Sequence, residues 1–516
     1  MSRAAPHALF TAQGFADALG PAAAWRVEPA HLDAPITGVS TDTRTLAPGQ
    51  AFVALRGERF DAHAFLADAL RCGASVAVID ARASVDDDVV ALTRERQAGL
   101  LAVDAAGQGD AGLLALHRLA RAWRDALAHA ACRVIAVAGS NGKTTTRHLI
   151  HHVLDTAPAS ATAPATKRQR LTGHQSPRSY NNHIGVPLTL LGAAGDDDFV
   201  VCELGTNHVG ELAPLAALAR PDIGVLTCLG REHLEHFGSV DAVAREEASL
   251  LHAIDATGTA IVHDDAWAQL ERLGLADVAC EVITFGEGDA ADWRLVARGR
   301  RDDGAQQLTV RDPGGAAHEV TLTLPGVHNA VNALAALAVA RLMQVPVDHA
   351  AARLADVAAV PGRLHLRQAG PVRIIDDAYN ANPDSMRSGL ATLLETPVTA
   401  PGRRVAILGD MLELGEHAPA EHRALGQRVA DSDDAIALAI LVGPMAMFAA
   451  ETLARHWPGD RVLALPTLDD RAADDIAQRL HAGDVVLVKA SRGLALERVV
   501  HAIEQRWTDA ATNEHE

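Results

Sequence analysis

A glycine-rich segment behind an apolar run constrains the fold of this chain more than any other feature. Residues 133–138, Arg-Val-Ile-Ala-Val-Ala, are typical of a buried strand, and Gly-Ser-Asn-Gly-Lys-Thr-Thr follows at 139–145. Strand, glycine loop and helix form the context of a phosphate-binding loop, because glycines let backbone N–H groups approach phosphate oxygens. The spacing is the short GxxGKT, since Val137 stands where the longer pattern has its first glycine. We expect a phosphate site formed by Gly139, Ser140, Asn141, Gly142, Lys143, Thr144 and Thr145.

Strand-like and helix-like segments alternate along the rest of the chain. Ala51–Leu55 and Val76–Ile79 are expected strands of the first region, and Ala62–Arg71 and Leu113–Leu127 are its expected helices. The stretch 259–324 is richer in strand-like pieces. Beyond about residue 370, helical segments separate strands predicted at Val372–Ile375, Val405–Leu408, Ile436–Val442, Val462–Leu465 and Val485–Val488.

Such alternation predicts an α/β fold whose mostly parallel sheets carry helices on their faces. The chain has 516 residues, enough for about three domains. We place their bounds near 1–130, 131–365 and 366–516.

The segment Thr156–Ser179 differs from its surroundings. It is rich in Ala, Pro, Thr and Ser, contains no acid, and has basic residues at Lys167, Arg168, Arg170 and Arg178. This composition predicts a flexible surface loop. Two interpretations remain open, a solvated insertion and a basic flap over an anionic substrate.

Composition and charge exclude several classes of function. The 65 acidic and 46 basic residues give a net charge of −19, which argues against nucleic acid as a partner. Five scattered cysteines without a CxxC pair indicate buried thiols in a reducing compartment. No signal peptide is apparent, and the apolar run Ala435–Val442 is too short to span a bilayer. We expect a cytoplasmic protein without membrane insertion.

Two further residues follow apolar runs and are candidates for the same site. Glu203 ends the run 199–202, and His233 follows the run 223–229. Ligands of open α/β sheets bind at the carboxyl ends of the strands, where a carboxylate can hold magnesium. Taken alone, a glutamate or histidine at such a position is more often a solvated surface residue than a ligand.

Several separated segments resemble the Mur ligase family. They are Ser-Thr-Asp-Thr-Arg at 40–44, the stretch 52–61, Ser-Tyr-Asn-Asn-His-Ile-Gly at 179–185, Glu-Leu-Gly-Thr-Asn-His at 203–208, Gly-Val-His-Asn-Ala-Val-Asn at 326–332, Asp-Asp-Ala-Tyr-Asn-Ala-Asn-Pro-Asp-Ser at 376–385 and Leu-Gly-Asp-Met-Leu-Glu-Leu-Gly at 408–415. The resemblance covers most of the chain from about 36 to 497 and is weakest at 156–179 and 287–320. The last two segments favour the family members that add D-alanyl-D-alanine.

The resemblance implies three domains: an N-terminal one for a UDP-sugar, a central ATP-binding one and a Rossmann-like C-terminal one. It also implies the substrates UDP-N-acetylmuramoyl-tripeptide and D-Ala-D-Ala, with ATP and Mg²⁺, in peptidoglycan precursor synthesis by a monomer. In this reaction ATP phosphorylates the tripeptide carboxylate, and the dipeptide amine then attacks the acyl phosphate.

The resemblance assigns a role to each candidate residue. Metal ligands would be Thr144, Glu203 and His233. ATP would also contact Asn329, Asn332, Arg363 and Asp377, and catalysis would depend on Lys143, His233 and Asp377, with Glu247 as a further catalytic candidate where the chain differs from the family. Substrates would be bound by Ser40, Asp42, Arg44, Asn181, Asn182, His183, Asn380, Asn382 and Asp384, with Lys489, Ser491 and Arg492 as further candidates. For Asn382, which precedes Pro383, helix capping is an open alternative.

The chain departs from the family at Glu247. The family usually has a carbamylated lysine about fourteen residues after the metal-binding histidine, and here that position is glutamate. We expect Glu247 to supply a permanent carboxylate instead, the alternative being a solvated helix acid. A different Mur-type ligase, a folylpolyglutamate-synthase relative and a non-catalytic nucleotide-binding protein also remain open.

Overall fold

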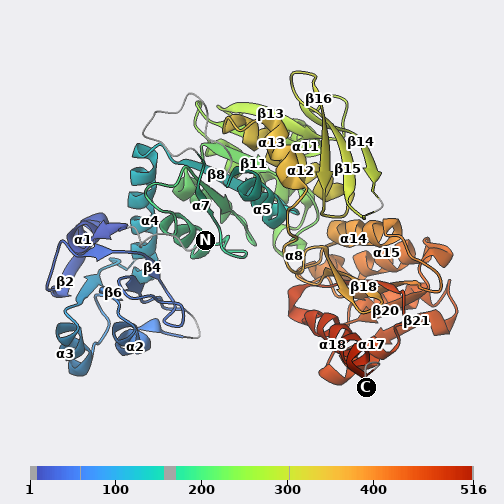
Figure 1. The fold of residues 1–516 in the computed structure, drawn as a ribbon. Coiled ribbons are helices and arrows are strands. Elements are labelled where there is room, and N and C mark those ends of the chain that lie inside the picture. The colour runs from blue at the N-terminus through green and yellow to red at the C-terminus, as the bar shows by residue number, and fades with distance from the viewer. Residues whose placement is uncertain (1–7, 58–59, 108, 156–169, 302, 514–516) are drawn as a thin grey trace.

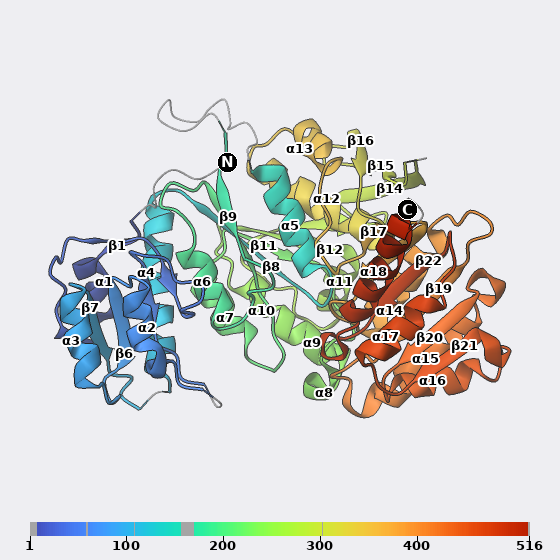
Figure 2. The same cartoon turned by 60° about the horizontal axis from the view of Figure 1, so that its bottom comes forward.

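Three sheets follow one another along the chain in the computed structural model, which describes residues 8–57, 60–107, 109–155, 170–301 and 303–513. Figure 1 shows the N-terminal sheet (blue) and the C-terminal sheet (orange to red) on either side of the central one. Figure 2 shows the same order after a turn of the molecule. The expected α/β architecture in three parts is confirmed, while the exact domain bounds stay predictions.

The N-terminal part is built on a five-stranded sheet. The strand order is β2-β7-β6-β5-β4, parallel except for β2 against β7. Their bounds are β2 Ala23–Val27, β7 Gly99–Val103, β6 Val76–Asp80, β5 Ala51–Val53 and β4 Val39–Ser40. A small pair, β1 (Phe10–Thr11) and β3 (Pro35–Ile36), and the helices α1 (Ala12–Leu19), α2 (Leu66–Arg71) and α3 (Asp87–Glu95) complete this part.

Helix α4 (Ala111–His129) joins the N-terminal part to the central one. Its apolar residues belong to one buried cluster that includes residues of both parts. Two polar side chains fix its far end, because Trp123 Nε1 donates to the carbonyl of Ala193 at 3.1 Å and Arg124 Nε donates to that of Ala219 at 2.9 Å. The helix is therefore a rigid connection between the two parts.

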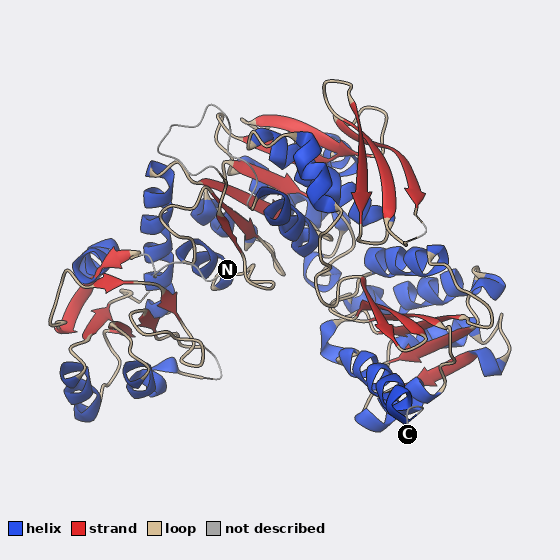
Figure 3. Ribbon diagram, viewed as in Figure 1, coloured by secondary structure: helices blue, strands red, loops and turns tan. Residues whose placement is uncertain are grey.

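The central sheet has nine strands in the order β16-β15-β14-β13-β12-β11-β8-β10-β9. The strands from β9 to β14 are parallel, whereas β14, β15 and β16 form an antiparallel extension visible in Figure 3. Their bounds are β8 Arg133–Ala138, β9 Gly173–Gln175, β10 Phe199–Glu203, β11 Ile223–Leu226, β12 Thr259–His263, β13 Glu281–Gly286, β14 Trp293–Arg300, β15 Gln306–Arg311 and β16 Ala317–Leu322.

Helices cover both faces of the central sheet. On one face α5 (Lys143–Leu154) packs against α12 (Val327–Leu342), whose residues 329–340 are all buried because small alanines allow close contact. The helix α13 (Val347–Leu354) lies beside them. The other helices of this part are α6 Gly185–Leu191, α7 Leu212–Ala219, α8 Leu234–Phe237, α9 Val240–Glu247, α10 Ser249–His252 and α11 Asp264–Arg272.

The register of the parallel strands brings the candidate residues to one edge. Glu203 at the end of β10 is paired with Val137, and Leu226 at the end of β11 with Ala138, one residue before the glycine loop. Because parallel strands end at the same edge, the loops after β8, β10 and β11 meet there.

The C-terminal part has six strands in the order β17-β18-β22-β19-β20-β21, parallel except for β17. Helices α14, α15 and α16 pack on one face, and α17 and α18 on the other, as Figure 1 also shows. The strands are β17 His365–Ala369, β18 Val372–Asp377, β22 Val485–Lys489, β19 Arg404–Gly409, β20 Leu438–Val442 and β21 Val462–Leu465. The helices are α14 Pro383–Glu395, α15 Ala418–Ala430, α16 Ala446–Leu453, α17 Asp470–Gln478 and α18 Glu497–Asn513.

Two expectations need correction. The expected loop 156–179 is wrong for Gly173–Gln175, which form the edge strand β9 beside β10, and for Ser176, which is fully buried. Residues 156–169 lie outside the described residues. The expectation that all five cysteines are buried is wrong for Cys72, which is exposed, and Cys228, which is half-buried. Within the described part of the chain, no helix has the length and apolarity needed to cross a bilayer.

Candidate active site

The glycine loop connects β8 to α5 with a backbone that requires glycine at two positions. Gly139 and Gly142 have φ angles of 119° and 86°, which disfavour any other residue. A Cβ on Gly142 would also lie 2.9 Å from the Asn332 side chain. The loop leads into α5 without a side-chain cap, so the first N–H groups of this twelve-residue helix remain available to an anion.

Lys143 lies among three acidic side chains. Its Nζ is 2.5 Å from the carbonyl of Gly139 and 3.4 Å from Glu232 Oε2. Burial acts to lower the pKa of Lys143, but the charges of Glu232, Glu247 and Glu203 outweigh it and raise that pKa. The ammonium group therefore stays charged.

Glu203 is almost completely buried and held from several sides. Its Oε1 accepts hydrogen bonds from Thr144 Oγ1 at 3.2 Å and from Asn181 Nδ2 at 3.1 Å, while Arg147 Nε donates to Oε2 at 3.3 Å. A solvated position for Glu203 is thereby excluded. The carboxylate and the Thr144 hydroxyl present two oxygen donors at one point of the cavity.

His233 and Glu232 follow β11 and reach the same cavity. His233 has a φ of 48°, a strained value for a residue with a side chain. Its Nε2 lies 3.9 Å from Glu232 Oε2. Glu232 Oε1 is buried and has no hydrogen-bond partner among the described residues. The sequence analysis did not select Glu232, although it precedes the selected histidine.

Glu247, at the end of α9, lies directly beneath the glycine loop. Its Oε2 accepts a hydrogen bond from Gly139 N at 2.8 Å, and the side chain is fully buried, so the solvated alternative is wrong. Burial raises the pKa of Glu247 to about 8. Glu247 is not among the residues that line the two cavities described below, and its expected permanent charge is not supported at neutral pH.

The C-terminal part contributes side chains across the domain boundary. Asn382 Nδ2 donates to Asn141 Oδ1 at 2.9 Å, and Arg231 N donates to Asp384 Oδ2 at 2.8 Å. Asn382 Oδ1 also accepts Ser385 N in a capping box at the start of α14, so the capping interpretation holds alongside the cross-domain contact.

A buried ion pair joins two strand ends of the C-terminal sheet. Lys489 Nζ lies 2.6 Å from Asp377 Oδ2 and also donates to the carbonyl of Asn380 at 2.9 Å. The Arg363 guanidinium stacks over the Tyr379 ring at 4.1 Å, and Arg492 lies over the same ring at 5.1 Å. Ser491 Oγ donates to the carbonyl of Ala381 at 3.2 Å.

Two neighbouring cavities collect most of the candidates. Both include residues of the glycine loop and Arg363. The first adds Asn329, Asn332, Asp377, Asp384 and Lys489. The second adds Asn181, Asn182, Glu203, His233, Asn380 and Asn382. His328 and Tyr379, which the sequence analysis did not select, line the first and the second cavity respectively.

Besides Gly139, Glu247, Ser491 and Arg492, four candidates lie outside both cavities. Ser40, Asp42 and Arg44 are in the N-terminal part, where Arg44 makes an exposed 2.6 Å ion pair with Asp42 and Ser40 Oγ donates to the Asp42 carbonyl. The side chain of His183 is exposed, and its carbonyl accepts from His117 Nε2 at 2.7 Å. Asn182 Oδ1 accepts from Ile184 N and Gly185 N at the start of α6.

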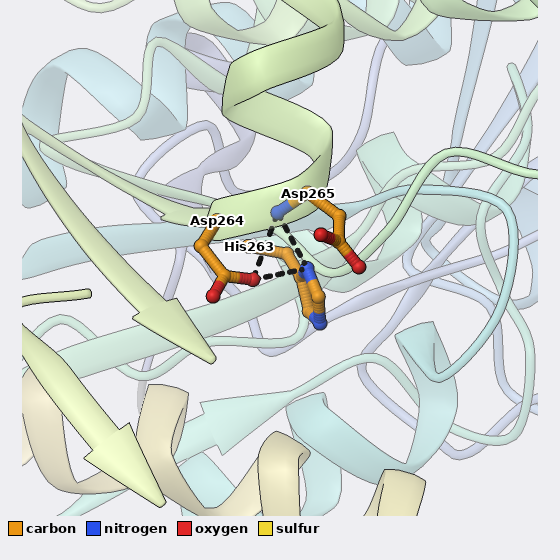
Figure 4. A group of neighbouring side chains, drawn as sticks. All are labelled: His263, Asp264 and Asp265. Atoms are coloured by element: carbon orange, nitrogen blue, oxygen red, sulfur yellow. Dashed lines mark hydrogen bonds and ion pairs between the residues drawn. The ribbon is translucent and has the colours of Figure 1, made fainter. Parts of the chain in front are cut away.

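A further cluster at the start of α11 contains His263, Asp264 and Asp265 (Figure 4), and His263 also lines the first cavity. His263 Nδ1 accepts Asp265 N at 3.2 Å, and Asp264 Oδ2 accepts Gly288 N at 2.8 Å. Because these atoms already accept backbone hydrogen bonds, we interpret the cluster as a helix cap.

Three family models match successive parts of the chain. They are "Mur ligase family, catalytic domain" at residues 35–109, "Mur ligase middle domain" at 137–340 and "Mur ligase, glutamate ligase domain" at 362–492. The middle match begins two residues before Gly139 and therefore includes the whole glycine loop.

Curated relatives and solved structures match over nearly the whole length. The UDP-N-acetylmuramoyl-tripeptide–D-alanyl-D-alanine ligase of Bacillus subtilis is 32% identical over 92% of this chain and 94% of its own. That of Escherichia coli is 31% identical, over 92% and 95%. The crystal structure of MurF from Acinetobacter baumannii superposes with a TM-score of 0.79 at 28% identity, over 97% of this chain and 100% of its own. MurF of Thermotoga maritima in complex with ADP gives 0.73 at 26% identity, over 92% and 98%. With this likeness and the geometry of the phosphate loop, the chain belongs to the Mur ligase family.

Proposed function

We propose that this protein is an ATP-dependent ligase that joins D-alanyl-D-alanine to UDP-N-acetylmuramoyl-tripeptide in peptidoglycan synthesis. The names of the relatives supply the substrates, and the glycine loop carries the proposal for this chain. Lys143, Thr144 and Glu203 lie together in a cavity that also receives Asn380 and Asn382 from the C-terminal part. Such a site can bring a nucleotide and a second substrate to the same place.

The chemistry requires activation of a carboxylate. The terminal phosphoryl group of ATP passes to an oxygen of the tripeptide carboxylate, which gives ADP and an acyl phosphate. The amine of the dipeptide attacks the carbonyl carbon, and the tetrahedral intermediate loses phosphate and a proton to leave the amide. Two anions must approach in the first step, so positive groups are needed to stabilise the charge.

The residues of the glycine loop fit the phosphates of ATP. Backbone N–H groups at the start of α5 would bind phosphate oxygens, and Lys143 would place its charge on the transferred group. The Lys143 ammonium lies among acidic side chains that raise its pKa and keep it charged. Asn329 and Asn332, on the adjoining cavity, would lie on the base side, and Arg363 and Asp377 would contact the nucleotide from the C-terminal side.

The donor set also fits magnesium. Mg²⁺ prefers hard oxygen ligands, and Thr144 and Glu203 already present theirs 3.2 Å apart. Glu232 Oε1 is a buried carboxylate oxygen on the same cavity without a partner among the described residues. Thr144, Glu203, Glu232 and His233 would hold the ion. When bound, the metal would neutralise charge on the phosphate oxygens.

The remaining candidates are proposed for the two other substrates. Asn380, Asn382 and Asp384 would contact the dipeptide, and Asn181 and Asn182 the tripeptide. Ser40, Asp42 and Arg44 would contact the UDP group at the N-terminal part. His183 would contribute through its backbone, since its carbonyl is fixed by His117. We place the activity in the cytoplasm and expect a monomer.

A coupled assay tests the function. ADP release should require ATP, UDP-N-acetylmuramoyl-tripeptide and D-Ala-D-Ala together, and mass spectrometry should find the tripeptide nucleotide enlarged by the dipeptide less one water. A site that pairs the polar groups of the dipeptide leaves them unpaired with a single amino acid, so free D-alanine should be a poor substrate. Equal use of D-alanine or L-lysine would indicate a different Mur-type ligase. No ADP release with any acceptor would indicate a non-catalytic nucleotide-binding protein.

A further inference from the structure

His233 of the central part meets Glu413 of the C-terminal part. His233 Nδ1 lies 2.5 Å from Glu413 Oε2. His233 stands in the loop before α8, and Glu413 in the loop after β19. The contact therefore joins the two parts across the domain boundary.

Both residues have a backbone conformation that is unfavourable for any residue with a side chain. The φ angles are 48° at His233 and 61° at Glu413, in the left-handed region. Strained residues with side chains persist only where their surroundings hold them, and they concentrate at functional sites. The Glu413 carbonyl also accepts Glu235 N at 3.0 Å, so the same residue binds α8 through its backbone. The two loops thus form one built contact.

The contact determines which nitrogen of His233 faces the cavity. A proton on Nδ1 would face the Glu413 carboxylate at this ion-pair distance, and the lone pair would then be on Nε2. Nε2 is the nitrogen on the side of Glu232, at 3.9 Å from Oε2, and both residues line the cavity of Thr144 and Glu203. A histidine that binds a metal through one nitrogen commonly donates from the other to a carboxylate, which fixes the ring and its tautomer.

We propose that Glu413 is a positioning residue which, when the C-terminal part docks, orients His233 and presents its Nε2 to a divalent cation. The proposal rests on the proposed function only in taking that cation as part of the site. It makes completion of the metal site depend on contact between the two parts. When the C-terminal part is not docked, His233 would not be correctly oriented. ATP would therefore not react before the dipeptide-binding part has docked.

A neighbouring contact provides the control. Glu421 Oε1 lies 3.0 Å from Arg231 Nη1, and this pair also joins the two parts. Within the described part of the chain Glu421 pairs with Arg231 and not with His233, so Glu421→Gln removes an interdomain carboxylate without changing the histidine's partner. Glu413→Gln keeps an oxygen that accepts the Nδ1 proton, whereas Glu413→Ala removes it.

The test measures cation binding without turnover. Mn²⁺ is titrated into the full-length protein with ADP, and the free ion is followed by electron paramagnetic resonance. Glu413→Ala should weaken Mn²⁺ binding by about tenfold or more, Glu413→Gln by less, and Glu421→Gln by less than about twofold. His233→Gln should weaken it as much as Glu413→Ala, and the double variant should add no further loss, because both changes remove one interaction.

Small-angle scattering of the same samples reports whether the parts remain docked. Unchanged Mn²⁺ binding in Glu413→Ala would overturn the proposal, as would an equal loss in Glu421→Gln. Full additivity of the His233 and Glu413 changes would also contradict it. These outcomes differ from failure of the proposed function, since an unmodified protein that ligates nothing can still bind Mn²⁺ through His233.

Discussion

The ammonium nitrogen of Lys143 lies 3.4 Å from Glu232 Oε2. Only 14% of the Lys143 side chain and 7% of that of Glu232 are exposed. An exposed loop lysine would have little effect on stability, but this one is largely buried. Lys143 compensates the charge of the largely buried Glu232 carboxylate.

Lys143→Ala should therefore lower both activity and stability. Removal of a charge that stabilises the transferred phosphoryl group should reduce kcat by about 100-fold or more. The uncompensated Glu232 carboxylate should also lower the melting temperature. Glu232→Gln in the Lys143→Ala background should restore much of the stability and none of the activity. Near-normal ligation by folded Lys143→Ala would refute the role of the lysine.

Glu247 should make stability depend on pH. Its pKa in the folded protein is raised to about 8 from an ordinary value of 4.5. The unfolded chain releases this proton at lower pH than the folded one, so the contribution of Glu247 to stability is complete below about pH 4.5 and is lost as pH rises toward 8. Glu247→Gln keeps an acceptor for Gly139 N without titrating. The difference in melting temperature, variant minus unmodified, should increase between pH 5 and 8.5; a constant difference would contradict the shifted pKa.

Glu247 should also affect the turnover rate. If Glu247 were a permanent carboxylate near the metal, Glu247→Gln would lower activity by about an order of magnitude or more. The contact with Gly139 leads to a different expectation: Glu247→Ala, which removes the acceptor beneath the glycine loop, should lower kcat more than Glu247→Gln at pH 7. Added or removed bicarbonate should leave the unmodified protein unaffected, because a glutamate cannot be carbamylated. Stimulation by bicarbonate would disprove this.

The positions that the sequence predicted well are those fixed by local rules. The strand before Gly139, the helix after Gly142 and the strand end at Glu203 follow from apolar runs and glycine, which act over a few residues. Parallel strand ends then bring these loops together without further information. The three-part α/β fold was predictable for the same reason.

Contacts across the domain boundary could not be predicted in this way. Glu413 was part of a quoted motif, but nothing local indicates that its carboxylate meets His233. Glu232 resembles any loop acid until its burial is known. Glu247 was selected for its charge, whereas its environment favours the neutral form. Burial and partner identity depend on tertiary packing, which sequence spacing does not record.

Two substitutions of Asn382 can separate its role as a helix cap from its contact with the glycine loop. Its Oδ1 caps α14 through Ser385 N, while its Nδ2 donates to Asn141 of the glycine loop. Asn382→Asp keeps the capping oxygen and loses the donor, and Asn382→Ala loses both. Asn382→Ala should lower stability by about 1 kcal/mol, and Asn382→Asp by much less. Both should raise KM for ATP or lower kcat if the link to Asn141 matters. Full activity in Asn382→Asp would leave capping as the whole role.

The segment before β9 should be dispensable for folding, with a sharp limit at its C-terminal end. A flexible surface loop over the whole of 156–179 would be replaceable throughout, but Gly173–Gln175 pair with β10 and Ser176 Oγ accepts the N–H of Glu203. Replacing 157–169 with a short Gly/Ser linker should change the melting temperature by less than about 3 °C, because loop-closure entropy varies slowly with length. Extending the replacement through Gln175 removes the edge strand and should cost considerably more. Calorimetry of both variants tests this: equal stability would show that β9 does not contribute to stability.

A ligation assay of the shorter replacement separates the two interpretations of the segment. If the variant is stable but ligates poorly, the segment acts as a basic flap over an anionic substrate. If ligation is unchanged, it is a solvated insertion.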